Sequence, residues 1–254
     1  MAVVALYSNK GGVGKTTAAV NLAYLAAKDG LPTLLVDLDA QGSATFYFRV
    51  KPKLKRKARG LTSASPAVLD SIRATDYARL DVLPADFSNR NLDLIYDKQK
   101  HRRRRLKDML GAFERDYALI VLGCPPTINV LGENILTAAD HLLVPLIPTT
   151  LSLRAHEQLV AFQKENEYPT GTTHVFFSMV DKRKKMHEDL MVHARQLFAS
   201  VLDSPIPALA QVEQMGIARE PLPAFAPRSN AARAYMDLWN EIQGIVRPVL
   251  PMDG

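Results

Sequence analysis

The stretch Ser8-Asn9-Lys10-Gly11-Gly12-Val13-Gly14-Lys15-Thr16-Thr17 decides the fold of this chain. It follows an apolar run and precedes a helical pattern, so it lies on a strand-to-helix turn. Its glycines let successive backbone N–H groups converge on a triphosphate, and the positive end of the helix adds to the attraction. Lys15 supplies a point charge to the phosphates, and the Thr16 hydroxyl suits a magnesium ion. The predicted phosphate contacts are Gly11, Gly12, Val13, Gly14, Lys15, Thr16 and Thr17.

Composition bounds the class of protein. A chain of 254 residues that is 47% hydrophobic is long enough for one α/β domain, which we expect to span 1–254. The single cysteine, Cys124, has no partner for an internal disulfide, which favours the cytoplasm. No apolar stretch reaches the roughly 18 residues of a membrane span. The net charge of +6 points to a polyanionic partner.

Short apolar runs alternate with helical patterns along most of the chain. The runs lack strict apolar and polar alternation, as expected of parallel strands that are buried on both faces. The predicted strands are 3–7, 33–36, 80–83, 119–122, 142–146 and 175–179, and the predicted helices are 16–28, 92–113, 153–166, 189–202 and 229–247. This order predicts a single doubly wound, mainly parallel α/β sheet with helices on both faces.

A second motif follows the predicted strand 33–36. Asp37 and Asp39 stand at alternate positions where that strand ends, near the carboxyl edge of the sheet that also carries the phosphate loop. Open α/β sheets bind ligands at this edge. The two carboxylates are therefore candidates for the nucleotide site, although aspartates also commonly cap the helix that follows a strand.

The eight residues from Lys10 to Thr17 resemble the deviant Walker A loop of the ParA/MinD family of P-loop ATPases. The resemblance implies that Lys10 reaches across an ATP-sandwich homodimer to the partner's nucleotide. It also implies that Asp39 positions or activates the attacking water and that Asp37 helps to hold the magnesium shell. The candidate catalytic residues are then Lys10, Lys15 and Asp39, the metal residues are Thr16 and Asp37, and the cofactors are ATP and Mg²⁺.

One position departs from the family pattern. The apolar strand before Cys124-Pro125-Pro126 ends in Gly123, where relatives carry an aspartate that contacts magnesium through water. The change removes one carboxylate from the metal site, so we expect slow hydrolysis. It also supports an alternative in which the protein is a nucleotide-dependent scaffold with little turnover.

Later segments extend the resemblance over most of the chain. The segment 145–155 is similar to the family's strand and dimer-facing helix, and 179–183 is similar to its segment near the adenine. Ile206-Pro207 precedes the loop that closes over the base in that family. The resemblance therefore implies base contacts by Asp181, Arg183 and Pro207.

The last predicted helix bears on a membrane alternative. MinD proteins end in a basic amphipathic membrane helix, whereas 229–247 has few cations and a broad apolar face with one tryptophan. We interpret it as a core helix that begins after an N-cap at Ser229 and stops before Pro248. A MinD-like membrane-surface regulator stays open as an alternative, but we expect no stable membrane insertion.

Basic residues gather in three clusters, at 49–59, 98–107 and 182–185. A charge run is often only a solvated face, but dimers of this family coat nucleoid DNA. Counterion release would let such clusters bind double-stranded DNA without reading its sequence. The predicted DNA contacts are Lys55, Arg56, Lys57, Arg102, Arg103, Arg104, Arg105, Lys182, Lys184 and Lys185.

These observations together predict a ParA-like ATPase. It would form an ATP-sandwich dimer, bind DNA non-specifically and position a cargo, which could be a plasmid, a chromosome or a protein body such as a carboxysome. A ParB-like protein or cargo adaptor would stimulate hydrolysis. The expected location is cytoplasmic and nucleoid-associated.

Overall fold

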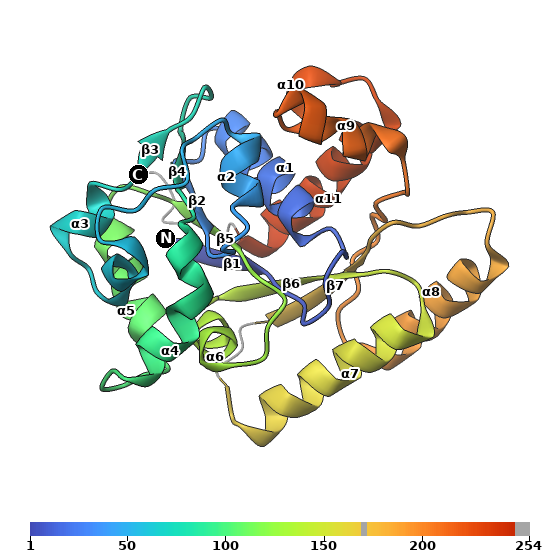
Figure 1. The fold of residues 1–254 in the computed structure, drawn as a ribbon. Helices are drawn as coiled ribbons and strands as arrows, with labels where there is room; N and C mark the ends of the chain where they lie inside the picture. Colours follow the sequence, from blue (N-terminus) through green and yellow to red (C-terminus); the bar gives the residue numbers. More distant parts are fainter. Residues whose placement is uncertain (169–171, 247–254) are drawn as a thin grey trace.

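The fold was analysed in a computed structural model that describes residues 1–168 and 172–246. Seven strands form one sheet in the order β3-β4-β2-β5-β1-β6-β7 (Figure 1). The strands are β1 Ala2–Leu6, β2 Thr33–Asp37, β3 Arg73–Ala74, β4 Leu80–Leu83, β5 Leu119–Gly123, β6 His141–Leu146 and β7 Thr172–Phe177. Every pairing is parallel except that of the two-residue edge strand β3. The predicted doubly wound parallel sheet is confirmed.

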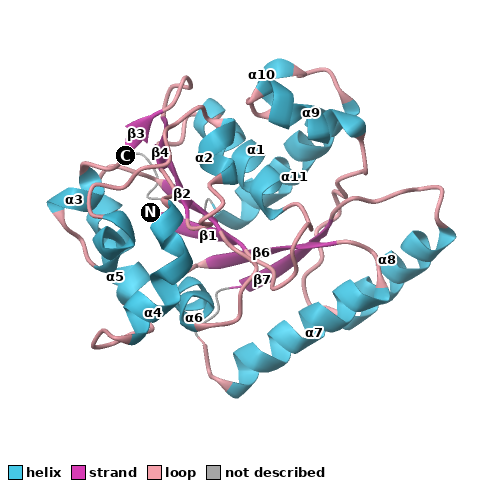
Figure 2. Ribbon diagram, viewed as in Figure 1, coloured by secondary structure: helices cyan, strands magenta, loops and turns pink. Residues whose placement is uncertain are grey.

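The central strands are apolar on both faces because each face is covered by helices (Figure 2). In β1, Val3 and Ala5 pack in one core, and Ala2, Val4 and Leu6 pack in the other. Neither face meets water, so the strand reads as a continuous apolar run. The phosphate loop follows β1 directly and therefore starts from a rigid, fully buried support.

The helices form two layers. One layer holds α1 and α11 with the shorter α2, α9 and α10, and the other holds α4 to α8 (Figure 1). The helix bounds are α1 Lys15–Lys28, α2 Ser43–Tyr47, α3 Pro66–Leu69, α4 Leu92–Asp97, α5 Arg105–Leu110, α6 Val130–Ala138, α7 Thr150–Glu165, α8 Lys185–Leu197, α9 Ala210–Ala218, α10 Leu222–Phe225 and α11 Asn230–Val246. Three 3-10 helices complete the described elements: η1 Lys57–Thr62, η2 Phe87–Asn91 and η3 Gly111–Phe113.

The predicted helix 92–113 is wrong as a single element. It divides into α4 and α5, joined by a turn at 98–104 in which His101 has a left-handed φ of 54°. The fully buried Asn134 of α6 stabilises the break. Its amide nitrogen donates to the carbonyl of Arg102 at 2.7 Å, and its amide oxygen accepts from the N–H of Leu106 at 3.1 Å. A distant side chain thus overrides the local helical pattern.

Other boundaries shift by a few residues. The predicted strand 175–179 begins earlier and ends at Phe177, two residues before Met179, whose φ is 54°. The predicted helix 189–202 forms as α8, Lys185–Leu197. The short elements β3, α2, α3, α9 and α10 were not predicted from the sequence, because segments of this length hold too few residues to display a period.

The predicted core helix is confirmed as α11. Its buried face includes Tyr235, Leu238 and Trp239, and it packs against α1. The indole N–H of Trp239 donates to Asp29 at 2.7 Å, and Ser229 accepts from the N–H of Ala232 at 3.1 Å, as an N-cap does. The predicted end of this helix, Arg247 and Pro248, lies outside the described residues. Within the described chain, no helix combines the length and apolar character that crossing a bilayer requires.

Candidate nucleotide-binding site

The phosphate loop turns sharply between β1 and α1. Gly12 and Gly14 have φ angles of 69° and 91°, in the left-handed region that glycine adopts without strain. At Gly14 a Cβ atom would also lie only 2.9 Å from the Ser178 hydroxyl oxygen, which follows β7 and would have to shift. Because α1 begins at Lys15, its unpaired N–H groups border the loop. The loop has the form of an anion site.

The two loop lysines point in different directions. Lys15 is buried, and its Nζ donates to the carbonyl of Lys10 at 2.5 Å, across the mouth of its own loop. Burial is the main cause that lowers the pKa of Lys15. The Nζ of Lys10 instead donates to the Ser152 hydroxyl at 3.3 Å, on the first turn of α7. Lys10 therefore lies against a neighbouring helix rather than over its own loop.

Asp37 is the last residue of β2. In the sheet, β5 lies between β2 and β1, the strand that leads into the phosphate loop. Asp37 is 2% exposed, and its Oδ2 accepts from the N–H and the hydroxyl of Thr45 at 2.8 and 2.7 Å. Burial raises the pKa of Asp37 to about 6, although the bonds from Thr45 act in the opposite direction. The Oδ1 atom accepts only a long bond, 3.3 Å, from the N–H of Asp39. That oxygen is the better donor for a metal or its water.

Asp39 lies on the turn after β2 and is partly exposed. Its Oδ1 accepts from the N–H of Gln41 at 3.0 Å, which orients the carboxylate. Its charge acts on Lys15, so the two groups share one electrostatic environment. The sequence-predicted carboxylates and the phosphate loop therefore meet at one edge of the sheet, as the motif order implied.

Gly123 is adjacent to Asp37 in the sheet register. A Cβ atom at Gly123 would meet the carbonyl oxygen of Val36 at 3.7 Å and the Oδ1 of Asp37 at 3.9 Å, both ordinary contacts. The position thus accommodates a Cβ atom beside Asp37 without a steric clash. The next residue, Cys124, is buried, and burial raises the pKa of its thiol, so it offers a metal no thiolate.

The donor set fits magnesium rather than a softer metal. Asp37, Asp39 and the Thr16 hydroxyl are oxygen donors, and Mg²⁺ bound with a nucleotide takes only one or two carboxylates and keeps several waters. Within 1–168 and 172–246, no group of three or more His, Cys, Asp and Glu side chains is arranged to hold a metal without other ligands. Phosphate oxygens and water would have to complete the shell.

A hollow of about 310 Å³ lies beside Gly14 and Thr17, where a base could follow the phosphates. Pro207, one of the predicted base contacts, lines it. Asp181 and Arg183 are not among its lining residues, since they pair with each other at 2.9 and 3.0 Å and the Arg183 side chain is 90% exposed. The sequence did not single out three larger side chains that also line the hollow: Leu209, Val212 and Tyr235.

Comparison with known proteins agrees with this geometry. A family model described as an AAA domain matches residues 1–168. Sporulation initiation inhibitor protein Soj of Bacillus subtilis (strain 168) is 30% identical over 246 residues, which cover 94% of this chain and 97% of that protein. Chromosome partitioning protein ParA of Caulobacter vibrioides (strain NA1000 / CB15N) is 30% identical over 251 residues, with 94% and 93% covered. The chain belongs to the ParA/MinD family of ATPases.

A solved structure gives the same fold. Cobyrinic acid a,c-diamide synthase from Mycobacterium smegmatis, solved with a bound ATP analog and magnesium, superposes with a TM-score of 0.82 over all of both chains. Its sequence is 24% identical to this one, so the likeness concerns the fold alone. The sequence comparison therefore shows the family, and the superposition shows that a solved structure shares the fold.

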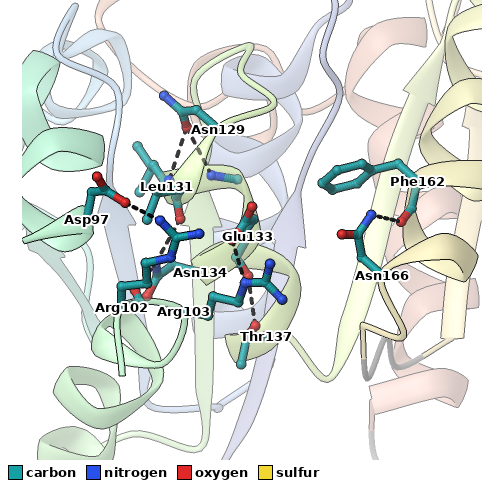
Figure 3. A network of polar contacts seen from close by, with 12 residues as sticks. Asp97, Arg102, Arg103, Asn129, Leu131, Glu133, Asn134, Thr137, Phe162 and Asn166 are labelled. Carbon is teal, nitrogen blue, oxygen red and sulfur yellow. Dashed lines mark hydrogen bonds and ion pairs between the residues drawn. The ribbon is translucent and has the colours of Figure 1, made fainter. Parts of the chain in front are cut away.

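The basic clusters of this ParA/MinD protein are partly neutralised by their own fold. In the cluster at 98–107, Arg103 pairs with Glu133 at 2.8 Å and Arg102 pairs with Asp97 (Figure 3). Arg105 of the same cluster pairs with Asp108 at 2.8 Å. In the cluster at 49–59, Lys55 pairs with Asp70 at 2.8 Å. Among the described residues, the ion pairs include none of the predicted DNA contacts Arg56, Lys57, Arg104, Lys182, Lys184 and Lys185.

Proposed function

We propose that the protein binds ATP with Mg²⁺ and forms an ATP-sandwich homodimer. The observation that carries this proposal is the divergence of the two loop lysines. The Lys15 side chain lies across the mouth of its own loop, whereas the Lys10 side chain turns away from that loop to the first turn of α7. A second positive charge at the edge of the loop would stabilise the negative phosphates of a nucleotide that is bound by another subunit.

ATP hydrolysis follows from the two carboxylates. Asp39 is the residue placed to orient the attacking water, because it is partly exposed and shares the field of Lys15. Asp37 holds the magnesium shell, and Lys15 neutralises charge that develops on the phosphates. Since Gly123 contributes no carboxylate, turnover is slow and the magnesium requirement is high.

The free cations of the second and third clusters bind double-stranded DNA without sequence preference. The candidates are Arg104, Lys182, Lys184 and Lys185, because none of them forms an ion pair among the described residues. The dimer on DNA then positions a cargo, and a ParB-like or cargo-adaptor protein stimulates its release. The relatives include a chromosome partitioning protein, which supports partition or a related positioning role.

The decisive experiment changes Lys10 alone. Lys10→Ala should leave ATP affinity within a few-fold of the wild type, because Lys15 and the backbone N–H groups still hold the nucleotide. It should abolish the ATP-dependent dimer measured by size-exclusion chromatography with light scattering. Lys15→Ala is the matched control, which should lose ATP binding itself. An ATP-dependent dimer that survives Lys10→Ala would contradict the sandwich proposal.

A second candidate function is a nucleotide-dependent scaffold with little turnover, and Gly123 favours it. Steady-state phosphate release separates the two. Release that stays at the level of an Asp39→Ala variant, with ATP, Mg²⁺ and DNA all present, would favour the scaffold. Measurable release that Asp39→Ala removes would favour the ATPase.

A further inference from the structure

A second hollow, of about 710 Å³, lies between the 3-10 helix η1 and the helix α4. It shares no lining residue with the phosphate loop or the base hollow. Four cations line it: Arg56, Lys57 and Arg59 from the first basic cluster, and Lys98 from the second. The fold therefore brings together charges that lie about forty positions apart in the sequence. The volume falls in the range of roughly 300–1,000 Å³ that is usual for ligand sites.

The positive charge of this hollow is uncompensated. Its lining contains no aspartate or glutamate, and none of its four cations takes part in an ion pair within the described chain. Asp86 is the acid that feels Lys57, and its carboxylate already accepts from Ser88 and from the N–H of Leu54. Burial alone would raise the pKa of Asp86, but these bonds and Lys57 outweigh it and lower the pKa. An anionic ligand would relieve the repulsion among the four cations.

The walls of the hollow are fixed before any ligand arrives. The N–H of Ala58 donates to the Ser88 hydroxyl at 2.7 Å, which ties η1 to η2. The buried Tyr96 of α4 donates its hydroxyl proton to the carbonyl of Leu61 at 2.9 Å, which ties α4 to the other end of η1. A ligand would therefore enter a preformed site, and its binding would cost little conformational entropy in the protein.

Apolar side chains decide what kind of anion fits. Leu94 lines the hollow and is 59% exposed, and Ile95 lines it from the next position of α4. Phe87, next in sequence to the lining residue Ser88, is 64% exposed with the Arg90 guanidinium 4.2 Å above its ring. A DNA backbone would meet the cations of the hollow but offers no apolar side chain to pack on the exposed leucine. We propose that this hollow binds an acidic peptide segment of a partner protein, in which apolar side chains are interspersed among carboxylates.

The test is fluorescence anisotropy with the full-length protein, without nucleotide. The probe is a fluorescein-labelled peptide that alternates pairs of glutamates with single leucines. Two comparison peptides replace the leucines by serine or the glutamates by lysine. The double variant Arg56→Glu, Lys98→Glu should bind the acidic leucine peptide at least about tenfold more weakly. Leu94→Ser should also weaken binding, by about three- to tenfold. Lys28→Glu, on the exposed end of α1, reverses one charge away from the hollow and should bind as the wild type does.

Each alternative gives a different outcome. Equal binding of the serine peptide and the leucine peptide would overturn the proposal, because it would show a surface that reads charge alone. Loss of random-sequence DNA binding in the double variant, in parallel with loss of peptide binding, would overturn it in favour of a nucleic-acid surface. No peptide binding at low salt would also overturn it. Because the assay omits ATP, its result does not depend on the sandwich dimer, and unchanged ATP affinity of each variant confirms that it is folded.

Discussion

The phosphate loop and the second basic cluster are both runs of neighbouring residues, yet the fold treats them differently. In the loop, the proposed binding groups are backbone N–H groups, so residues that are adjacent in sequence would stay adjacent around the ligand. In the cluster at 98–107, the side chains diverge: Arg103 turns to Glu133, Arg105 turns to Asp108, and Lys98 joins the hollow beside Arg56. A site built from backbone groups can be read along a sequence, whereas a charged surface depends on what the fold brings beside it.

Among changes near the phosphate loop, we expect the largest effect on ATP turnover from Gly123→Asp. The Cβ atom of the new side chain fits beside Asp37 without a clash, so the carboxylate should lower the magnesium requirement and raise ATP turnover, by about 10–100-fold as for other groups around a metal. Mg²⁺ titrations of steady-state phosphate release measure both. Adding Asp39→Ala to the same chain should remove the gained turnover. If neither quantity changes, the end of β5 does not serve the metal.

The next test uses pH. The folded pKa of Asp37, about 6, lies above its usual value of 3.8, so its contribution to nucleotide-free stability is full below about pH 4 and is lost as pH rises through about 6. Magnesium needs the carboxylate and therefore shows the opposite trend. Lowering the pH from about 7 to about 5 should raise the magnesium requirement for ATP binding about tenfold. Asp37→Asn should need more magnesium at every pH, and a flat profile in the wild type would exclude Asp37 from the metal site.

A smaller effect is expected where the loop meets α7. Lys10 must leave Ser152 before it can reach a partner subunit. Ser152→Ala removes the acceptor but keeps the backbone N–H that Thr149 caps, so the ATP-dependent dimer should tighten by about fivefold, the value of one net hydrogen bond. Analytical ultracentrifugation with ATP measures the dimer constant, and Ser63→Ala on the exposed surface is the control. A weaker dimer would show that Ser152 supports Lys10 in the dimer instead.

The smallest effect tests the charge side of the comparison. Arg104→Ala should lower the slope of log K against log salt for random-sequence DNA by about 0.9, the value for one lost phosphate contact. Arg103→Ala should change it less, because the Arg103 guanidinium is held by Glu133 and lies 5.5 Å from the centre of the Tyr168 ring. Equal changes in the two variants would mean that the ion pairs open on DNA and that sequence clustering was the better guide.

Sequence reasoning succeeded where the determining residues are local. The glycines of the loop, the strand ends at Asp37 and Gly123 and the buried face of α11 all follow from patterns a few residues long. It failed where a distant side chain decides. Asn134 breaks the predicted helix 92–113 from a different element, and Tyr235 reaches the base hollow from the last helix. The sequence near residue 100 does not predict the contact with Asn134, and the sequence near residue 207 does not predict the position of Tyr235 beside the hollow.

The buried thiol of Cys124 has a use of its own. It is the single cysteine of the chain, it lies directly after Gly123 at the edge of the sheet that carries the phosphate loop, and it is buried, which raises the pKa of its thiol. A thiol reagent can therefore reach the thiol only when this edge of the sheet opens. The rate of labelling then measures how often that opening occurs. A ligand that binds the closed edge lowers the population of the open state, and the labelling rate falls by the same factor. The unmodified protein carries its own reporter of occupancy, at one defined atom.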